Sequence, residues 1–307
     1  MINTANLKKR LLFVAVAVPI AFVVVNWTFS LSAFALKILG MAPGACPDIY
    51  LGQIVALGIV LLGAHEYMKM LSHRESNAFW LGYLWIIAMG AAYLFKYPVP
   101  NTLSNSVLLM IVIFEAFIWG KNAPQKRWKR ASLFFIGVIF LNIASISLMS
   151  FYREPFEALF IKFSYPMIAK LDMVVVITAT FMCDSAAYFV GSAWGKHKLT
   201  SISPKKTVEG SAAGLAASII IMTVCWVFIS KPKYSSIYIG VVMGVLIGVM
   251  AQVGDLLVSL IKRYFQVKDA SHIIPGHGGI LDRFDSLFFT APVLYLFAWL
   301  LTLTEAG

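Results

Sequence analysis

Long apolar runs alternate with short polar connections along the whole chain. A helix rises about 1.5 Å per residue, so runs of this length can cross the roughly 30 Å hydrocarbon core of a bilayer. The pattern therefore predicts an all-α integral membrane protein, a polytopic bundle of about nine transmembrane helices. The runs cover residues 11–36, 49–71, 79–95, 103–119, 132–151, 173–191, 211–230, 237–261 and 286–303.

Composition and charge agree with a membrane protein. Hydrophobic residues make up 60% of the chain and charged residues 13%, whereas soluble domains are about 45 to 50% apolar. The net charge of +11 does not indicate nucleic acid, because the basic residues lie in short connections where anionic lipid headgroups attract them. Three isolated cysteines, Cys46, Cys183 and Cys225, form neither a disulfide framework nor a zinc motif.

The distribution of Lys and Arg predicts the topology. Most of the 25 basic residues lie in the connections that are cytoplasmic when the N-terminus is cytoplasmic and the C-terminus outside. We divide the chain into N-terminal membrane helices, 1–170, with spans 1–5 and a connector, and a C-terminal catalytic membrane region, 171–307. That region has cytoplasmic loops at 192–210 and 262–285. A multi-pass protein of the cell membrane is expected, the inner membrane if bacterial, with its site facing the cytoplasm.

The most unusual stretch lies near the C-terminus, between Ser259 and Asp285. Carboxylates beside cations suit a site that holds Mg²⁺ and phosphate together, since oxygen ligands take the metal while Lys and Arg take phosphoryl oxygens. Glycines at 276, 278 and 279 would let the backbone approach a phosphate. The charged and imidazole side chains of the stretch are Lys262, Arg263, Lys268, Asp269, His272, His277, Asp282, Arg283 and Asp285.

The stretch reads S-x-I-K-R-x4-K-D-x-S-x2-I-P-x-H-G-G-I-x-D-R-F-D, which resembles the signature of phosphatidate cytidylyltransferases, also called CDP-diacylglycerol synthases. The resemblance extends upstream through D-S-A-A-Y-F-V-G at 184–191 and I-S-P-K-K-T-V-E-G at 202–210. Departures are Ser192 in place of a basic residue, Val208 in place of Trp, and a connection at 199–202 that is one residue shorter. The resemblance implies transfer of the cytidylyl group of CTP to phosphatidate, giving CDP-diacylglycerol and pyrophosphate for phospholipid biosynthesis.

The resemblance also implies a set of site residues. Asp255 and Asp282 are expected to bind the metal centre, which in the family resembles Mg²⁺ paired with a monovalent cation such as K⁺. Asp184, Asp269 and Asp285 are second choices for that role. Phosphate and CTP contacts are expected from Lys205, Lys206, Ser259, Lys262, Arg263, Lys268, His277, Gly278, Gly279 and Arg283, although the role of His277 stays open.

Four carboxylates fall inside predicted spans, where each costs at least about 2.5 kcal/mol and needs a function or a partner. Asp255 has Ser259 on the same face, which leads into the signature, and Asp184 can reach a polar cavity on the same side. The alternative for both is a buried hydrogen bond between helices. Glu66 and Glu115 have no motif around them, so pairing with a neighbouring helix is expected.

Several alternatives stay open at this point. Lys205 and Lys206 are either anchors at a helix start capped by Ser203 or part of a phosphate cradle at a helix N-terminus. Gly240, Gly244 and Gly248 predict a smooth stripe on which another helix packs. A polyprenol or phytol kinase, a CDP-archaeol synthase and an ion-coupled transporter remain competing functions. Expected partners are CTP, phosphatidate and membrane lipids, with a homodimer possible.

Overall fold

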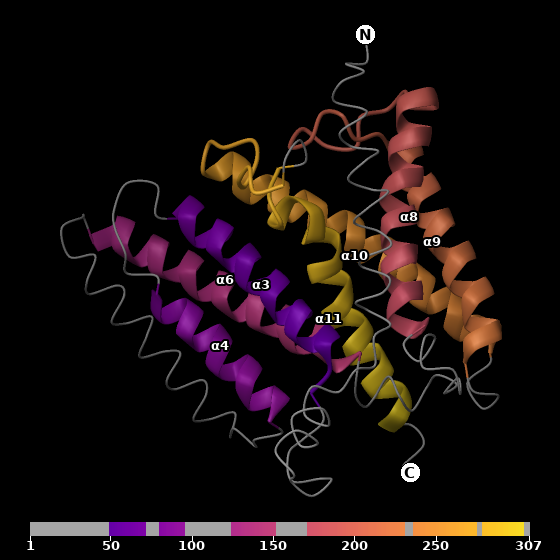
Figure 1. The fold of residues 1–307 in the computed structure, drawn as a ribbon. Coiled ribbons are helices and arrows are strands. Elements are labelled where there is room, and N and C mark those ends of the chain that lie inside the picture. Colours follow the sequence, from indigo (N-terminus) through magenta and orange to yellow (C-terminus); the bar gives the residue numbers. More distant parts are fainter. Residues whose placement is uncertain are drawn as a thin grey trace, which may run out of the picture.

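The computed structural model describes residues 49–71, 80–95, 124–151, 171–230, 236–274 and 278–303. Over these residues the protein is helical, and it contains no β-strand there beyond two isolated bridges, Lys198 with Thr207 and Ile274 with Gly278. The helices are α3 (Leu51–Leu71), α4 (Trp80–Leu94), α6 (Pro124–Ser150), α8 (Leu171–Trp194), α9 (Val208–Ile229), α10 (Ile237–Tyr264) and α11 (Leu281–Leu303) (Figure 1).

The all-α prediction is confirmed over this part of the chain. Six of the helices are long and apolar enough to cross a membrane, and α4 is a shorter apolar helix. Seven of the nine predicted runs correspond to these helices. The runs at 11–36 and 103–119 lie outside the described residues, so the count of about nine spans stays a prediction.

Several helices extend further than predicted, so the connections between them are shorter than predicted. Helix α10 continues to Tyr264 and α11 begins at Leu281, so the connection between them is 265–280 and not 262–285. Likewise the connection between α8 and α9 is 195–207 rather than 192–210. Helices continue past the hydrocarbon core into the headgroup region, where charged side chains are tolerated. The apolar run in the sequence therefore ends before the helix does.

The helices form two groups that are joined by α11. Helix α9 packs against both α8 and α10, while α6 packs against both α3 and α4. Helix α11 contacts α10 and α8 of the first group and α6 and α3 of the second, and it lies between the groups in Figure 1. The N-terminal and C-terminal groups of described helices therefore contact each other mainly through α11.

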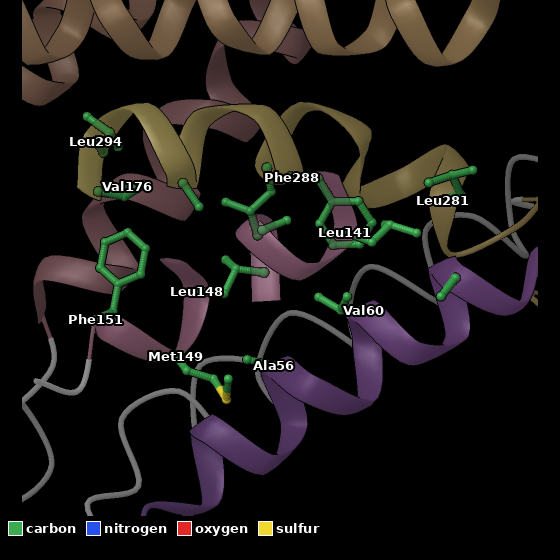
Figure 2. Close-up of a cluster of buried hydrophobic side chains, with 14 of the residues drawn as sticks. Ala56, Val60, Leu141, Leu148, Met149, Phe151, Val176, Leu281, Phe288 and Leu294 are labelled. Carbon is green, nitrogen blue, oxygen red and sulfur yellow. The ribbon is translucent and has the colours of Figure 1, made fainter. Parts of the chain in front are cut away.

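The core between α11 and the N-terminal group is made of interlocking apolar side chains (Figure 2). Phe288 of α11 is fully buried together with Leu141 and Leu148 of α6. Gly63 of α3 lies under the ring of Phe288, where an added Cβ would come within 3.0 Å of it. Because lipid is as apolar as these side chains, close packing of this kind, rather than exclusion of water, holds membrane helices together.

The glycine stripe of α10 packs against α9, as predicted. A Cβ at Gly240 would lie 2.9 Å from the Cα of Thr223, and one at Gly244 would meet the backbone of Ile219. This close approach lets the Ser218 hydroxyl of α9 donate a hydrogen bond of 3.0 Å to the carbonyl of Gly244. The stripe packs α9 along the N-terminal half of α10, so that the start of α9 and the connection before it lie beside the C-terminal half of α10.

Candidate active site

A cavity of about 510 Å³ lies between α8, α9 and α10, under the 195–207 connection. Four residues predicted for the site line it: Asp184, Lys205, Lys206 and Asp255. They come from three separate segments of the chain, so the fold brings them together as the motifs suggested. The remaining lining residues are Ala187, Tyr188, Gly191, Ser192, Leu199, Thr207, Ser211 and Gln252.

The central polar contact of the cavity is an ion pair between Lys206 and Asp255. Lys206 Nζ lies 2.6 Å from Asp255 Oδ2, and the side chains are 24% and 33% exposed. Ser259, one helical turn further along α10, donates to Asp255 Oδ1 at 3.4 Å. The charged atoms are thus partly desolvated yet open to a ligand, a setting in which charges interact more strongly than in bulk water.

The 195–207 connection is folded back on itself, which fixes the two lysines. The amide of Leu199 donates to the carbonyl of Lys206 at 2.9 Å, and the amide of Val208 donates to the carbonyl of His197 at 2.9 Å. Glu209 holds the other end of the turn, since its carboxylate lies 2.6 Å from His197 Nδ1 and accepts from the amide of Lys196 at 3.1 Å. Lys205 and Lys206 therefore enter the cavity from an ordered turn.

The predicted cap of α9 is wrong. Thr207, not Ser203, is the N-cap, and its hydroxyl accepts a hydrogen bond of 3.1 Å from the amide of Gly210. Helix α9 begins after the two lysines, so they lie just before its N-terminus rather than within its first turn. The amide dipoles of a helix N-terminus favour anions, which adds to the positive charge of the lysines.

A second group of carboxylates lies beside the cavity, where α8 and α11 meet. Ser286 donates through its hydroxyl to Asp184 Oδ2 at 3.0 Å and through its amide to Asp285 Oδ1 at 2.7 Å. Asp285 is almost completely buried. Ser286 thus links the carboxylates of α8 and α11 through its two hydrogen bonds.

The signature segment contains its own ion pair, between Lys262 and Asp282. Lys262 Nζ lies 2.6 Å from Asp282 Oδ1, and the side chains are only 12% and 8% exposed. The other oxygen, Oδ2, accepts from the amides of Ala270 at 2.8 Å and Gly279 at 2.9 Å. Asp282 therefore joins the end of α10 and both sides of the connection to the start of α11.

Glu66 contacts the same segment from the N-terminal half of the chain. Its carboxylate is fully buried. It accepts from the hydroxyl of Ser271 at 2.5 Å, from the amide of Ile280 at 2.8 Å and from the amide of Leu281 at 2.7 Å. The expectation that Glu66 pairs with a neighbouring helix is confirmed, but the partner includes the signature segment as well as the N-terminus of α11.

The glycines of the signature fit these two carboxylates. Gly278 has a φ of +88°, a region that residues with a side chain rarely adopt, and a Cβ there would lie 2.9 Å from Asp282 Oδ2. A Cβ on Gly279 would collide with the carboxylate of Glu66. In this structure the two glycines make room for carboxylates, and their predicted contact with phosphate stays a prediction.

The other predicted side chains of the signature do not line the cavity in the part of the chain that the structure describes. Five of them are exposed instead. Arg263 donates to the carbonyl of Val267 at 3.4 Å. His277 lies outside the described residues, as do Glu115 and Cys46. The exposed side chains are Arg263, Lys268, Asp269, His272 and Arg283.

Within the described ranges, no three His, Cys, Asp or Glu side chains are grouped closely enough to form a ready-made metal site. The donor chemistry nevertheless suits Mg²⁺, which prefers carboxylate oxygens and one or two carboxylates together with substrate phosphates. Asp255 and Asp282, the predicted ligands, are each paired with a lysine, through contacts of the same 2.6 Å length. Their joint role as a metal centre stays a prediction.

Comparison with known proteins places these residues in a family. The profile of the cytidylyltransferase family matches residues 8–301, nearly the whole chain. The chain belongs to this family. The match covers α3, α4 and α6 as well as the helices around the cavity, so the N-terminal group of helices is part of the family's fold.

Individual relatives are similar over shorter stretches. The phosphatidate cytidylyltransferase of Bacillus subtilis is 46% identical over 122 residues, which are 39% of this chain and 44% of the relative. The phosphatidate cytidylyltransferase of Synechocystis is 41% identical over 131 residues, which are 43% of this chain and 44% of the relative. That of Staphylococcus haemolyticus is 34% identical over 204 residues, 64% of this chain and 78% of the relative. The chain thus spans less than half the length of the first two relatives.

Sequence reasoning missed several residues of the site. Thr207, Ser286 and Gln252 are uncharged polar residues without a distinctive spacing, and the partners of Ser286 and Gln252 depend on how the helices pack. Gln252 donates to the carbonyl of Ser211 at 3.0 Å and so joins α10 to α9 at the cavity wall. Glu66 was noticeable in the sequence because it is a carboxylate near the end of a predicted span. Its hydrogen-bond partners could not be identified from the sequence.

Proposed function

We propose that the protein transfers the cytidylyl group of CTP to phosphatidate, releasing pyrophosphate and forming CDP-diacylglycerol. The observation that carries this proposal is the cavity in which Lys205 and Lys206, at the N-terminus of α9, face Asp255 of α10. Cations beside a carboxylate, at a helix N-terminus, are suited to a nucleotide phosphate that arrives with a divalent metal. The family and the names of the relatives support the same reaction.

The chemistry requires positioning more than covalent help. A phosphate oxygen of phosphatidate forms a bond to the α-phosphorus of CTP, while the bond from that phosphorus to the oxygen bridging the α and β groups breaks. Pyrophosphate leaves with the electron pair. Because a phosphate monoester is already ionised near neutral pH, the nucleophile needs no strong base, and catalysis comes from in-line alignment and neutralisation of charge.

The lysines of the site have a clear task in this reaction. Lys205 and Lys206 would bind phosphoryl oxygens of CTP, with the amides at the start of α9 adding partial positive charge. Lys206 would leave Asp255 for a phosphate oxygen on substrate binding, which frees the carboxylate. In the same way, Lys262 would leave Asp282 for a phosphate oxygen. Arg263, Lys268 and Arg283, which are exposed, would attract the triphosphate.

Family membership implies the use of Mg²⁺, and the residues would hold it through Asp255 and Asp282 with Asp184 and Asp285 in support. When bound, the metal would neutralise the negative charge that develops on the phosphoryl oxygens. A monovalent cation such as K⁺ beside it is part of the proposal.

The lipid substrate would enter from the bilayer along α8. Tyr188 lines the cavity and is also 70% exposed, so the cavity borders the outer surface of a spanning helix. A tyrosine at such a place can lie at the headgroup level of the membrane, where phosphatidate presents its phosphate. We place this end of the bundle in the cytoplasm because of the charge distribution of the connections.

Purified protein in detergent, given CTP, Mg²⁺ and phosphatidate, tests the proposal. Pyrophosphate and CDP-diacylglycerol should form in equal amounts. Diacylglycerol in place of phosphatidate should give no CTP turnover, because it lacks the attacking phosphate. Formation of phosphatidate from diacylglycerol and CTP would identify a lipid kinase instead, and lipid-independent ion flux into proteoliposomes would identify a transporter.

A further inference from the structure

Glu66 is a buried carboxylate whose hydrogen-bond partners lie in the connection between α10 and α11 and at the first residue of α11. It accepts three hydrogen bonds, from the hydroxyl of Ser271 and from the amides of Ile280 and Leu281. The last of these partners is 215 positions away in the chain. A carboxylate that caps the amides of a helix N-terminus is stabilised both by charge-assisted hydrogen bonds and by the helix dipole.

Glu66 and Asp282 hold the same short piece of backbone from two sides. Asp282 accepts from the amides of Ala270 and Gly279, and Glu66 accepts from the neighbouring positions, Ser271 and Ile280. Each carboxylate thus joins the middle of the connection to its end. Only one of them is paired with a cation among the described residues, since Lys262 contacts Asp282.

The backbone of the connection packs closely against Glu66. Gly279 lies directly against its carboxylate, so that any side chain at that position would collide with it. On α3 the neighbouring turn is fixed by Gly63, which lies under Phe288 and close to Leu281 of α11. The position of α3 and the position of the signature segment are therefore coupled through Glu66.

We propose that Glu66 is a positioning residue for the reaction, which holds the 270–282 segment so that Asp282 and Lys262 face the substrate site. The proposal rests on the proposed function, because that function assigns Asp282 to the metal and Lys262 to phosphate. It gives the N-terminal half of the chain a part in the chemistry. Residues that orient metal-binding groups through hydrogen bonds typically contribute about 10-fold to 100-fold to metal affinity.

The test compares Glu66→Gln with a matched control on the same helix, Gln53→Leu. Gln53 is also fully buried. Its side chain donates a hydrogen bond to the carbonyl of Met149 of α6 and accepts one from the amide of Tyr50, just before α3. It lies 13 positions before Glu66, which is about 20 Å along a helix. Glu66→Asp retains the charge but shortens the side chain, and Ser271→Ala removes one donor without changing α3.

Hydrogen exchange of the 270–282 peptide in detergent, without substrate, is the first measurement. Glu66→Gln should speed exchange of the Ile280 and Leu281 amides by about 10-fold or more, since each loses a charge-assisted acceptor. Gln53→Leu should leave these amides unchanged, and Glu66→Asp should be intermediate. Ser271→Ala should add little to Glu66→Gln, because both remove the same contact.

The Mg²⁺ concentration for half-maximal CTP turnover is the second measurement. It should rise by about 10-fold or more in Glu66→Gln and stay at the wild-type value in Gln53→Leu. Unchanged amide exchange and unchanged Mg²⁺ dependence in Glu66→Gln would overturn the proposal, as would equal changes in both variants. If the wild-type protein turned over no CTP with phosphatidate, the proposed function would fail, while the exchange experiment would still decide whether Glu66 holds the segment.

Discussion

The ion pair between Lys206 and Asp255 offers a sharp test of the site, because a structural pair and a catalytic pair respond differently to its removal. We consider Asp255→Asn, Lys206→Gln and the double variant. Each single variant leaves one charge without its partner, whereas the double variant removes both charges together. Lys198→Gln is the control, since Lys198 is an exposed cation of the same connection that does not line the cavity.

The structure sets the size of the stability effect. At the observed 2.6 Å between Lys206 Nζ and Asp255 Oδ2, the attraction between two full charges would be roughly 6 kcal/mol at an effective dielectric constant near 20. The side chains are 24% and 33% exposed, however, so solvent screening and desolvation reduce the net contribution to about 1 kcal/mol or less. Loss of the pair should therefore change the ratio of folded to unfolded protein by a factor of about 5 at most.

The effect on activity should be much larger. Removing one charged group that acts in a transition state typically costs about 100-fold to 1,000-fold in kcat. We expect a loss of this size in Asp255→Asn and in Lys206→Gln, and no recovery in the double variant, because groups that act as a unit are not additive. Pyrophosphate release measures activity, and a thermal melt in the same detergent measures stability.

A different outcome would refute the reasoning. If the double variant regained near wild-type turnover while either single variant was inactive, the pair would be a structural contact, and the losses would come from an uncompensated charge. If Asp255→Asn, folded and inserted normally, kept full activity at limiting Mg²⁺, the metal site would have to be rebuilt around Asp184 and Asp285. The activity of Lys198→Gln should stay within a factor of about 3 of the wild-type activity, because exposed charges have weak effects.

Three further predictions concern the surroundings of the site. Gly279→Ala should lower activity by about 10-fold or more, because its methyl group displaces the Glu66 carboxylate; full activity in a pyrophosphate assay would contradict the contact. Thr207→Ala should destabilise the start of α9 by about 1 kcal/mol, and Thr207→Ser should not; thermal melts distinguish the two. In a variant without native cysteines, Lys198→Cys should react with a membrane-impermeant reagent from the cytoplasm only and Ser236→Cys from outside only, so labelling from one side would remove a span from the topology.

The helical architecture could be predicted from the sequence because a membrane span has a strong signal. Residues 237–261, for example, are apolar over a length that only a helix or a buried segment can satisfy in lipid. The ends of the helices were harder to predict, since α10 continues through Lys262 and Arg263 to Tyr264. For a polar residue in the headgroup region, the sequence does not show whether the backbone around it is still helical.

The site was predictable where a motif held several fixed polar residues. Lys205, Lys206, Asp184 and Asp255 share one cavity, although their motifs are separate in the chain. The partners of each side chain were not predictable: the pairing of Asp282 with Lys262 depends on where α11 begins, and that of Glu66 depends on how α3 crosses α11. Such contacts arise from packing between distant segments, for which a single sequence gives no distance information.

Because α11 joins both groups of helices, the order in which the chain is synthesised has a consequence for its maturation. Leu281 emerges 215 positions after Glu66, which at about 5 to 20 residues per second is a delay of roughly 10 to 40 seconds. During that interval the Glu66 carboxylate is in the membrane without the amides that later bind it. A nascent chain arrested before α11 would thus display an uncapped intramembrane acid, the kind of feature that can mark an unassembled membrane protein for degradation.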